Sequence, residues 1–276
     1  MMKTLTVVGA GKVGKVLAKN FQRHAQFSIQ QILNRSLPSA QAAVSWLGTG
    51  EACDDMQCMQ PADIYMLTVA DDQIASACAA LVDAGLVNAD SVLFHCSGAK
   101  ASTVLSAANA LGAAVASVHP VRSFADIEQL AEHFASSICS VEGDERALAV
   151  LLPALQAIGA ETVIISAESK LLYHAGSVFA SNYLVTLMET ALQCYQAAGI
   201  PLEIAQKMAA PLARQSLENA FSMGPVAALT GPIARGDMQT VVLQQKAVTD
   251  WNAATGQLYQ AFTPPTQALA ARKKSL

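Results

Sequence analysis

The chain has little charge: only 14% of its 276 residues are Asp, Glu, Lys or Arg, whereas 53% are apolar. The formal net charge is −4, so the basic surface that nucleic-acid binding needs is missing, and no nucleic-acid partner is expected. The high apolar content instead predicts a large buried fraction, supplied by a sheet covered on both faces or by an interface between subunits.

The chain also lacks long apolar runs. No uninterrupted stretch reaches the ~18 apolar residues that a membrane span requires, so we expect no membrane segment. The first apolar run begins at Leu5, and no charged segment, apolar segment and cleavage site precede it. A chain without such a leader is expected to be cytoplasmic.

The six cysteines follow no metal-binding or redox pattern. None belongs to a Cys-x-x-Cys motif, and none has a histidine at the spacing of a zinc site. The sequence therefore predicts no metal centre, and the thiols are expected to be small buried groups in a reducing compartment. They are Cys53, Cys58, Cys78, Cys96, Cys139 and Cys194.

A glycine motif opens the chain. Residues 5–14 read Leu-Thr-Val-Val-Gly-Ala-Gly-Lys-Val-Gly, an apolar run followed by Gly-x-Gly-x-x-Gly, and a helical pattern continues to Phe21. In a dinucleotide site Gly9 would form the turn, Gly11 would let the backbone approach the phosphates, and Gly14 would let the helix pack against the strand. The strand-turn-helix context favours this interpretation; the alternative is a glycine-rich turn that binds nothing.

Strand-like and helix-like segments alternate through the first half of the chain. Short apolar runs are separated by helical patterns such as Lys12–Arg23 and Ala40–Leu47. This repeated order predicts an α/β fold with a doubly wound parallel sheet. The predicted strands are Leu5–Gly9, Phe27–Leu33, Glu51–Cys53, Ile64–Val69, Ser91–His95, Ala113–Val118, Ile138–Glu142 and Thr162–Ile165, and the other predicted helices are Asp71–Leu81, Ala101–Ala110 and Asp144–Ile158.

The pattern changes after Ser166, where only long helical patterns follow, broken by glycine and proline. The second domain is therefore expected to be all-helical, and we predict domains at residues 1–166, for the dinucleotide, and 167–276, for the substrate and for dimerisation. Such apolar helices predict a homodimer, with the small side chains of Ala205, Ala209, Ala210 and Ala213 as one candidate contact. The predicted helices are Glu168–Ala198, Pro201–Phe221, Thr240–Gln260 and Pro265–Lys274.

The end of the second predicted strand bears on the choice of dinucleotide. A site selective for NAD usually has Asp or Glu here, which binds the ribose 2′-hydroxyl. This chain has Asn34-Arg35-Ser36 instead, and the guanidinium of Arg35 suits a 2′-phosphate. We therefore predict NADP as the cofactor; the alternative is that Arg35 is an ordinary surface residue. The predicted cofactor-binding residues are Gly9, Gly11, Lys12, Val13, Gly14, Asn34, Arg35, Ser36, Val69, Ala70 and Ser97.

Polar residues follow the next predicted strands and should line the nicotinamide end of the same crevice. Ser97 comes after one strand and His119 after the next. His119 is a candidate catalytic residue because an imidazole titrates near neutral pH; alternatively it holds its loop by bonding to the backbone. His95, at the end of the preceding strand, could line the crevice too; the alternative is that it is a core histidine with a structural role.

The helical part supplies a second set of candidates. Lys170 and His174 lie four residues apart and therefore on one face of a helix. Lys170 could donate a proton or stabilise an oxyanion, and His174 could orient a carbonyl; the alternative is a solvated lysine. Asn182 and Arg235 are candidate substrate-binding residues, unless Arg235 only pairs with Asp237 to hold a turn.

These residues also carry a resemblance. The whole chain resembles a Rossmann-type oxidoreductase family with a helical C-terminal domain of unknown function, described as NADP-dependent or as similar to F420-dependent NADP oxidoreductases. The resemblance implies an NADP-binding protein with no settled substrate. The matching stretches are Val8–Gly14, His95–Gly98, Val118–Pro120 with Phe124, Tyr173–Ala175 with Ser181 and Asn182, and Leu229–Asp237.

More distant families resemble the chain in layout. The β-hydroxyacid dehydrogenases, 6-phosphogluconate dehydrogenase and ketopantoate reductase carry Lys-x-x-x-Asn in a helical domain, where this chain has Lys170 and His174. Prephenate dehydrogenases have a serine after one strand and His-Pro after the next, which Ser97 and His119-Pro120 match. Pyrroline-carboxylate reductase is similar in architecture, although its Pro-Gly-Gly-Thr-Thr loop is absent.

Taken together, the residues and the resemblance predict an NADP(H)-dependent oxidoreductase that acts on a small carbonyl, imine or hydroxy-acid. The predicted catalytic residues are Lys170, His119, Ser97 and His174. Two alternatives remain: a non-catalytic NADP-binding sensor or scaffold, and a methyltransferase that uses the same glycine loop.

Overall fold

The computed structural model describes residues 2–273, which form two compact units that meet between Phe179 and Ala180. Each unit is described here by itself. The compact units divide at the end of helix α7 (Lys170–Ala180), which lies later in the chain than the predicted domain boundary after residue 166. That boundary stays a prediction, because compact units are not the same as functional domains. Residue 1, with which the first predicted domain begins, lies outside the described residues. So do residues 274–276, which include the ends of the second predicted domain and of the predicted helix Pro265–Lys274.

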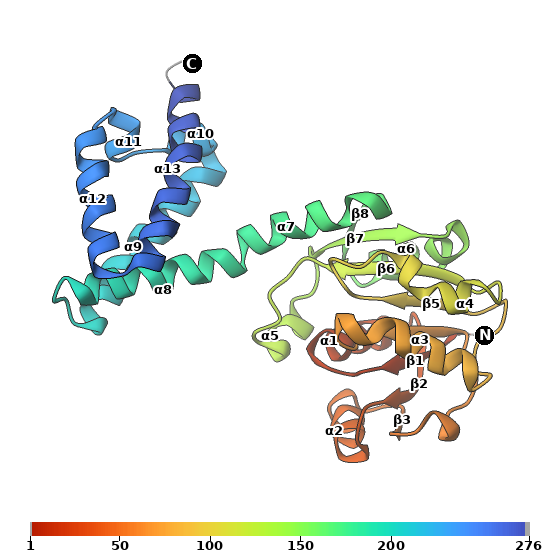
Figure 1. Ribbon diagram of the computed structural model, residues 1–276. Coiled ribbons are helices and arrows are strands. Elements are labelled where there is room, and N and C mark those ends of the chain that lie inside the picture. The colour runs from red at the N-terminus through yellow and green to blue at the C-terminus, as the bar shows by residue number, and fades with distance from the viewer. Residues whose placement is uncertain (1, 274–276) are drawn as a thin grey trace. The chain divides into compact units, whose positions relative to one another are not determined.

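The first unit is built on one eight-stranded sheet with the order β3-β2-β1-β4-β5-β6-β7-β8 (Figure 1). Its order reverses between β1 and β4, as in a doubly wound fold. This confirms the predicted α/β class, and every predicted strand is present within a few residues of its expected bounds. The strands are β1 Thr4–Val8, β2 Ser28–Leu33, β3 Glu51–Cys53, β4 Ile64–Leu67, β5 Val92–His95, β6 Ala114–Pro120, β7 Ile138–Gly143 and β8 Glu161–Ile164.

One pair of strands departs from the parallel arrangement: β6 and β7 run antiparallel. The chain between them forms only the helix α5 (Ile127–Glu132), and six helical residues span about 9 Å, too little to carry the chain back along the sheet. Strand β7 therefore starts beside the end of β6, where Val121 N donates to Ile138 O at 2.8 Å. Strand β8 then pairs with β7 in parallel.

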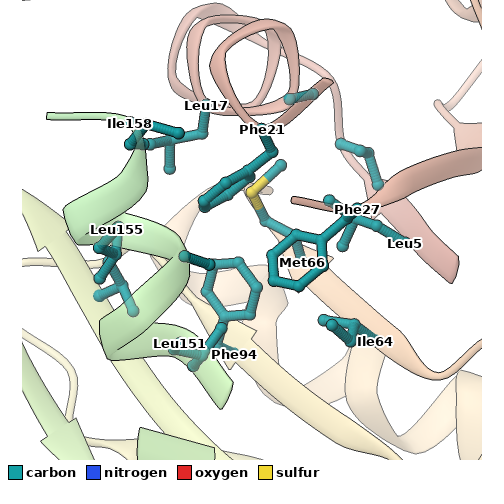
Figure 2. Close-up of a cluster of buried hydrophobic side chains, with 14 of the residues drawn as sticks. Leu5, Leu17, Phe21, Phe27, Ile64, Met66, Phe94, Leu151, Leu155 and Ile158 are labelled. Carbon is teal, nitrogen blue, oxygen red and sulfur yellow. The ribbon is translucent and has the colours of Figure 1, made fainter. Parts of the chain in front are cut away.

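Helices cover both faces of this sheet. Apolar side chains of α1 (Lys12–Arg23), α2 (Leu37–Leu47), α5 and α6 (Glu145–Ala157) pack in one core cluster. Those of α3 (Ile74–Asp83) and α4 (Ser106–Asn109) pack in the other. Figure 2 shows the first cluster, in which rings and aliphatic chains interlock between α1, the strands and α6. The labelled residues are Leu5, Leu17, Phe21, Phe27, Ile64, Met66, Phe94, Leu151, Leu155 and Ile158.

Two of the predicted helices begin differently from expectation. The segments predicted as helices Asp71–Leu81 and Ala101–Ala110 each start with a 3₁₀ turn, Asp71–Gln73 and Ser102–Leu105, before the α-helical part. A short 3₁₀ turn also spans Met56–Cys58.

All secondary structure in the described part of the second unit is helical, which confirms the predicted helical C-terminal region. No helix within residues 2–273 has both the length and the apolarity needed to cross a membrane. The helices are α8 Asn182–Ala197, α9 Leu202–Met223, α10 Pro225–Ala228, α11 Pro232–Arg235, α12 Met238–Trp251 and α13 Ala253–Lys273.

The helix boundaries of this region differ from the predictions in three places. The predicted helix Glu168–Ala198 breaks at Ser181, whose φ and ψ of −127° and −72° are not helical. The predicted helix Thr240–Gln260 breaks at Asn252, whose Oδ1 accepts from Thr255 N at 2.9 Å and so begins a new helix. In contrast, α13 continues through Pro264 and Pro265, where a break was expected, because packing against α12 outweighs local propensity.

Candidate functional site

The glycine loop joins β1 to α1 by a tight turn. Gly9 has a φ of +85°, and a Cβ on it would lie 2.6 Å from Val69 Cγ1 and 2.9 Å from Val69 N. The hydroxyl of Thr68 donates to Gly9 O at 2.6 Å, and a Cβ on Gly14 would collide with the same hydroxyl oxygen. Gly9 and Gly14 are thus required where the turn and α1 approach the end of β4.

The amino-terminal end of α1 faces open space. Gly11 is its N-cap and makes no side-chain capping bond, and a Cβ on Gly11 would meet nothing within 4 Å. The first turn also contains no acidic residue. Its free N–H groups can therefore receive an anion.

Asn34 holds the glycine loop to α2. Its Oδ1 accepts from Ala10 N at 2.7 Å, and its Nδ2 donates to Ser39 Oγ at 3.0 Å. Both ends of the amide are thus engaged within the protein, which leaves the exposed side chains of Arg35 and Ser36 as the polar groups that this strand end offers to a ligand.

A groove of about 1150 Å³ runs along these strand ends, which exceeds the roughly 300–1,000 Å³ of most small-molecule pockets. It takes in six of the predicted cofactor-binding residues besides Asn34, namely Gly9, Gly11, Arg35, Ser36, Val69 and Ala70. It also contains polar residues that were not predicted to bind the cofactor, among them Asp54, Asp72 and Gln73.

The remaining predicted cofactor-binding residues lie elsewhere. Lys12 Nζ donates to Ala125 O at 3.3 Å, and Val13 packs against the apolar core. Gly14 faces Thr68 rather than the groove. Ser97 is buried and belongs to the turn after β5, described next.

Ser97 organises the turn that follows β5. Its hydroxyl donates to Asp71 Oδ2 at 2.7 Å and accepts from Lys100 N at 2.9 Å. Its N–H donates to His95 Nδ1 at 3.2 Å, so His95 carries its proton on Nε2, which lies 3.1 Å from Ala101 O. His95 is therefore a core histidine whose two nitrogens both serve the backbone.

Three side chains gather around Gly98. The His119 ring at the end of β6 lies with its Nδ1 2.8 Å from the hydroxyl of Tyr173 on α7. The rings of His119 and His174 stand edge to face, with centroids 5.6 Å apart. A Cβ on Gly98 would collide with His174 Nδ1 and lie 2.9 Å from His119 Nε2, so only glycine allows both imidazoles to pack here. His119 thus bonds a tyrosine rather than the backbone of its own loop.

Lys170 lies buried beneath this cluster, with 1% of its surface exposed. Its Nζ donates to Ser117 Oγ on β6 at 2.6 Å, which excludes the alternative of a solvated lysine. Burial lowers the pKa of Lys170, and the nearby carboxylate of Glu142 opposes that shift. Glu142 itself is buried and accepts from both the N–H and the hydroxyl of Ser102.

The two histidines of the sheet are held neutral. Burial lowers the pKa of His119 to about 4, and His174 and Lys170 add to the shift. Burial likewise lowers the pKa of His95 to about 4. Burial raises the pKa of Tyr173, so its phenol stays protonated at neutral pH. His119 and Tyr173 can therefore donate and accept hydrogen bonds without carrying a charge.

Asn182 and Arg235 belong to the second compact unit, whereas the other candidate residues belong to the first. Asn182 begins α8, and Arg235 is an exposed residue at the end of α11. Asp237 does not pair with Arg235 among the described ion pairs; it accepts from Thr240 N and Thr240 Oγ1 and so caps α12.

Sequence reasoning gave no role of their own to three residues of the site: Asp71, which bonds Ser97, and Gly98 and Tyr173, which pack with His119. Tyr173 was given no role because the reasoning rested on Lys170 and His174, which lie four residues apart on one helical face. Tyr173 lies between them on the same helix, and this position was the available signal. Asp71 and Gly98 follow strands that were predicted, but their roles depend on contacts between separate strand ends.

The shifted pKa of His95 predicts a loss of stability in mild acid. The fold favours neutral His95, with a pKa of about 4 against an ordinary 6.5, so the unfolded chain binds the proton first as the pH falls. Relative to neutral pH, this group should cost about 2 kcal/mol of unfolding free energy at about pH 5. Urea unfolding of the wild type and of His95→Gln at both pH values checks this, and an equal pH dependence in the two proteins contradicts it.

Comparison with known proteins agrees with this architecture. Residues 2–120 match the family model of a Rossmann-like domain, and residues 137–266 match DUF2520, a domain of unknown function. No curated protein matches the chain.

Three solved structures resemble the chain over nearly its whole length. Protein TM1727 from Thermotoga maritima is 25% identical, with a TM-score of 0.77, and the match covers 98% of this chain and 99% of that one. A protein from Bacteroides fragilis, described as an NADP oxidoreductase, is 19% identical, with a TM-score of 0.79 and coverage of 97% and 98%.

An imine reductase from Myxococcus stipitatus in complex with NADP+ is 16% identical, with a TM-score of 0.66 and coverage of 98% and 94%. At these identities, the Bacteroides and Myxococcus structures establish a shared fold. The resemblance found in the sequence is confirmed at the level of its two parts: the first matches the model of a Rossmann-like domain, and the second matches the model of DUF2520.

Proposed function

We propose that the protein is an NADP(H)-dependent oxidoreductase that transfers hydride to or from a small carbonyl, imine or hydroxy-acid substrate. The observation that carries the proposal is the groove at the carboxyl ends of β1 to β4, formed by a strand, a glycine turn and an uncapped helix. A groove of this kind receives a dinucleotide with its pyrophosphate at the helix N-terminus.

The groove fits NADP by the chemistry of its walls. The open space beside Gly11 admits phosphate oxygens to the N–H groups of α1. Arg35 offers a permanently charged fork of donors, and Ser36 a hydroxyl, for a 2′-phosphate. The likeness to an imine reductase bound to NADP+ and to a Bacteroides protein described as an NADP oxidoreductase supports the same cofactor.

The reacting end of the site is assigned to the strand ends of β5 and β6. When bound, the cofactor supplies the hydride. His119, with Tyr173 bonded to its Nδ1, would hydrogen-bond the reacting oxygen or nitrogen of the substrate and move the proton at that atom. His174 would orient the substrate beside it, while Ser97 and Lys170, both buried, would hold the neighbouring strand ends in position.

Arg35→Ala tests the assignment of the 2′-phosphate. Loss of a charge-assisted bond worth about 1.5–3 kcal/mol should weaken NADPH binding by roughly 10- to 100-fold and change NADH binding little. Titration calorimetry with both nucleotides measures this. Arg146→Ala is the matched control, because Arg146 Nη2 donates only to Ala89 O and Gly112 O, outside the groove. Equal losses for NADPH and NADH would contradict a contact to the 2′-phosphate.

His119→Gln and Tyr173→Phe test the reacting end. NADPH oxidation with a panel of small carbonyl acids and imines should fall by about 10²- to 10⁴-fold in His119→Gln, and less in Tyr173→Phe. NADPH affinity should stay within about twofold in both, because neither residue lines the groove. Tyr259→Phe, in the second unit, is the control. If the wild type binds NADPH but oxidises it with no substrate, a sensor or scaffold becomes the better proposal.

A homodimer through the helical domain is part of the proposal. Of the small residues of α9 predicted for this contact, Ala205 is fully buried, whereas Ala209, Ala210 and Ala213 are partly exposed. Large apolar side chains on α8, α9 and α12 are exposed as well, and a second copy of the chain would cover them. They include Val185, Leu212, Phe221, Val242 and Leu243.

Phe221, 87% exposed, offers the sharpest test of this dimer. The wild type should sediment as a dimer at micromolar concentration, and Phe221→Glu should weaken the association, because a charge buried in an apolar interface is costly. Sedimentation velocity measures both, with Leu111→Glu on the first unit as the control. A monomeric wild type would contradict the proposal.

A further inference from the structure

A carboxylate stands at the end of the groove where Arg35 lies. Asp54 follows β3 and lines the groove together with Arg35 and Ser36. Its Oδ2 accepts a hydrogen bond from Leu37 N at 3.1 Å. Leu37 is the first residue of α2, whose N-cap, Ser36, makes no side-chain capping bond. Asp54 therefore serves as the cap of α2 from a neighbouring strand.

This contact changes what the end of the groove offers to a ligand. The free N–H groups at the start of a helix attract anions, but at α2 the N–H of Leu37 is already bonded to Asp54. The amide of Asn34 is committed to Ala10 and Ser39. Arg35 is thus left as the cation that attracts a phosphate here, while the carboxylate of Asp54 repels one.

We propose that Asp54 is a specificity-determining residue. Its carboxylate repels the 2′-phosphate that Arg35 attracts, and so reduces the ratio by which the groove binds NADP(H) more tightly than NAD(H). The proposal rests on the proposed function, since it concerns the same nucleotide site. A carboxylate near a 2′-phosphate costs binding energy through like-charge repulsion, whereas a ribose 2′-hydroxyl meets no such repulsion and can donate a hydrogen bond to it. The end of β2 lacks a carboxylate, and β3 supplies one.

The neighbouring Asp55 provides a matched comparison. Its Oδ1 accepts from Gln57 N at 2.9 Å and caps the short turn Met56–Cys58, and it does not line the groove. Asp54 and Asp55 carry the same charge one residue apart, so a general change in the field of the protein would affect both variants equally. Only a local effect in the groove would separate them.

The test measures dissociation constants of NADPH and NADH by titration calorimetry for the wild type, Asp54→Asn and Asp55→Asn. The asparagine at position 54 keeps an acceptor for Leu37 N and removes the charge. Asp54→Asn should tighten NADPH binding by about fivefold or more at low salt, and by a smaller factor at high salt. The same change should not tighten NADH binding. Asp55→Asn should leave both constants within about twofold of the wild type.

The outcomes separate this proposal from the one on which it rests. If the wild type binds neither nucleotide, the proposed function fails and this proposal fails with it. If both bind but the ratio of their affinities is unchanged in Asp54→Asn, or shifts equally in Asp55→Asn, only the role of Asp54 is overturned. Should Asp54→Asn unfold at a lower temperature than the wild type, Asp54→Ser, which also keeps an acceptor without charge, takes its place.

Discussion

The candidate reacting end depends on one buried polar contact, between the amine of Lys170 and the hydroxyl of Ser117. Burying an amine is costly unless it is bonded, and the field of Glu142 offsets part of that cost. The contact fastens the first turn of α7 to β6. One turn further along α7, Tyr173 and His174 then lie beside His119, two residues beyond Ser117 on the same strand. The cluster follows from this anchor.

Close approach at Gly98 completes the same arrangement. The two imidazoles pack where a side chain would otherwise stand, and their burial in turn keeps His119 uncharged by lowering its pKa. The packing of α7 against the ends of β5 and β6 therefore buries the imidazole of His119, keeps it uncharged and fixes its position beside His174. A change at Gly98 would disturb all three together.

The order of strands and helices was predictable because apolar periodicity and glycine turns are local signals; the helix Lys12–Arg23 and the strand Glu51–Cys53 have the predicted bounds. What the sequence could not supply were pairings across the fold. Asp54 reaches α2 from β3, and Tyr173 meets His119 across 54 positions of the chain. The continuity of α13 through two prolines was missed because packing against α12, rather than local propensity, decides it.

The two ends of the candidate site differ in how they use charge. At the nucleotide end the side chains of Arg35 and Asp54 are exposed, so dissolved salt screens their electrostatic effect on a phosphate. At the reacting end, burial favours neutral imidazole and phenol groups, over which salt has little influence. Ionic strength should thus act on cofactor binding, whereas acid should act on the reacting groups and on the stability of the sheet that holds them. Under the proposed function, a site divided in this way can bind a highly charged cofactor while keeping the atoms that exchange hydride and proton in a weakly polar environment, where hydrogen bonds are stronger than in water.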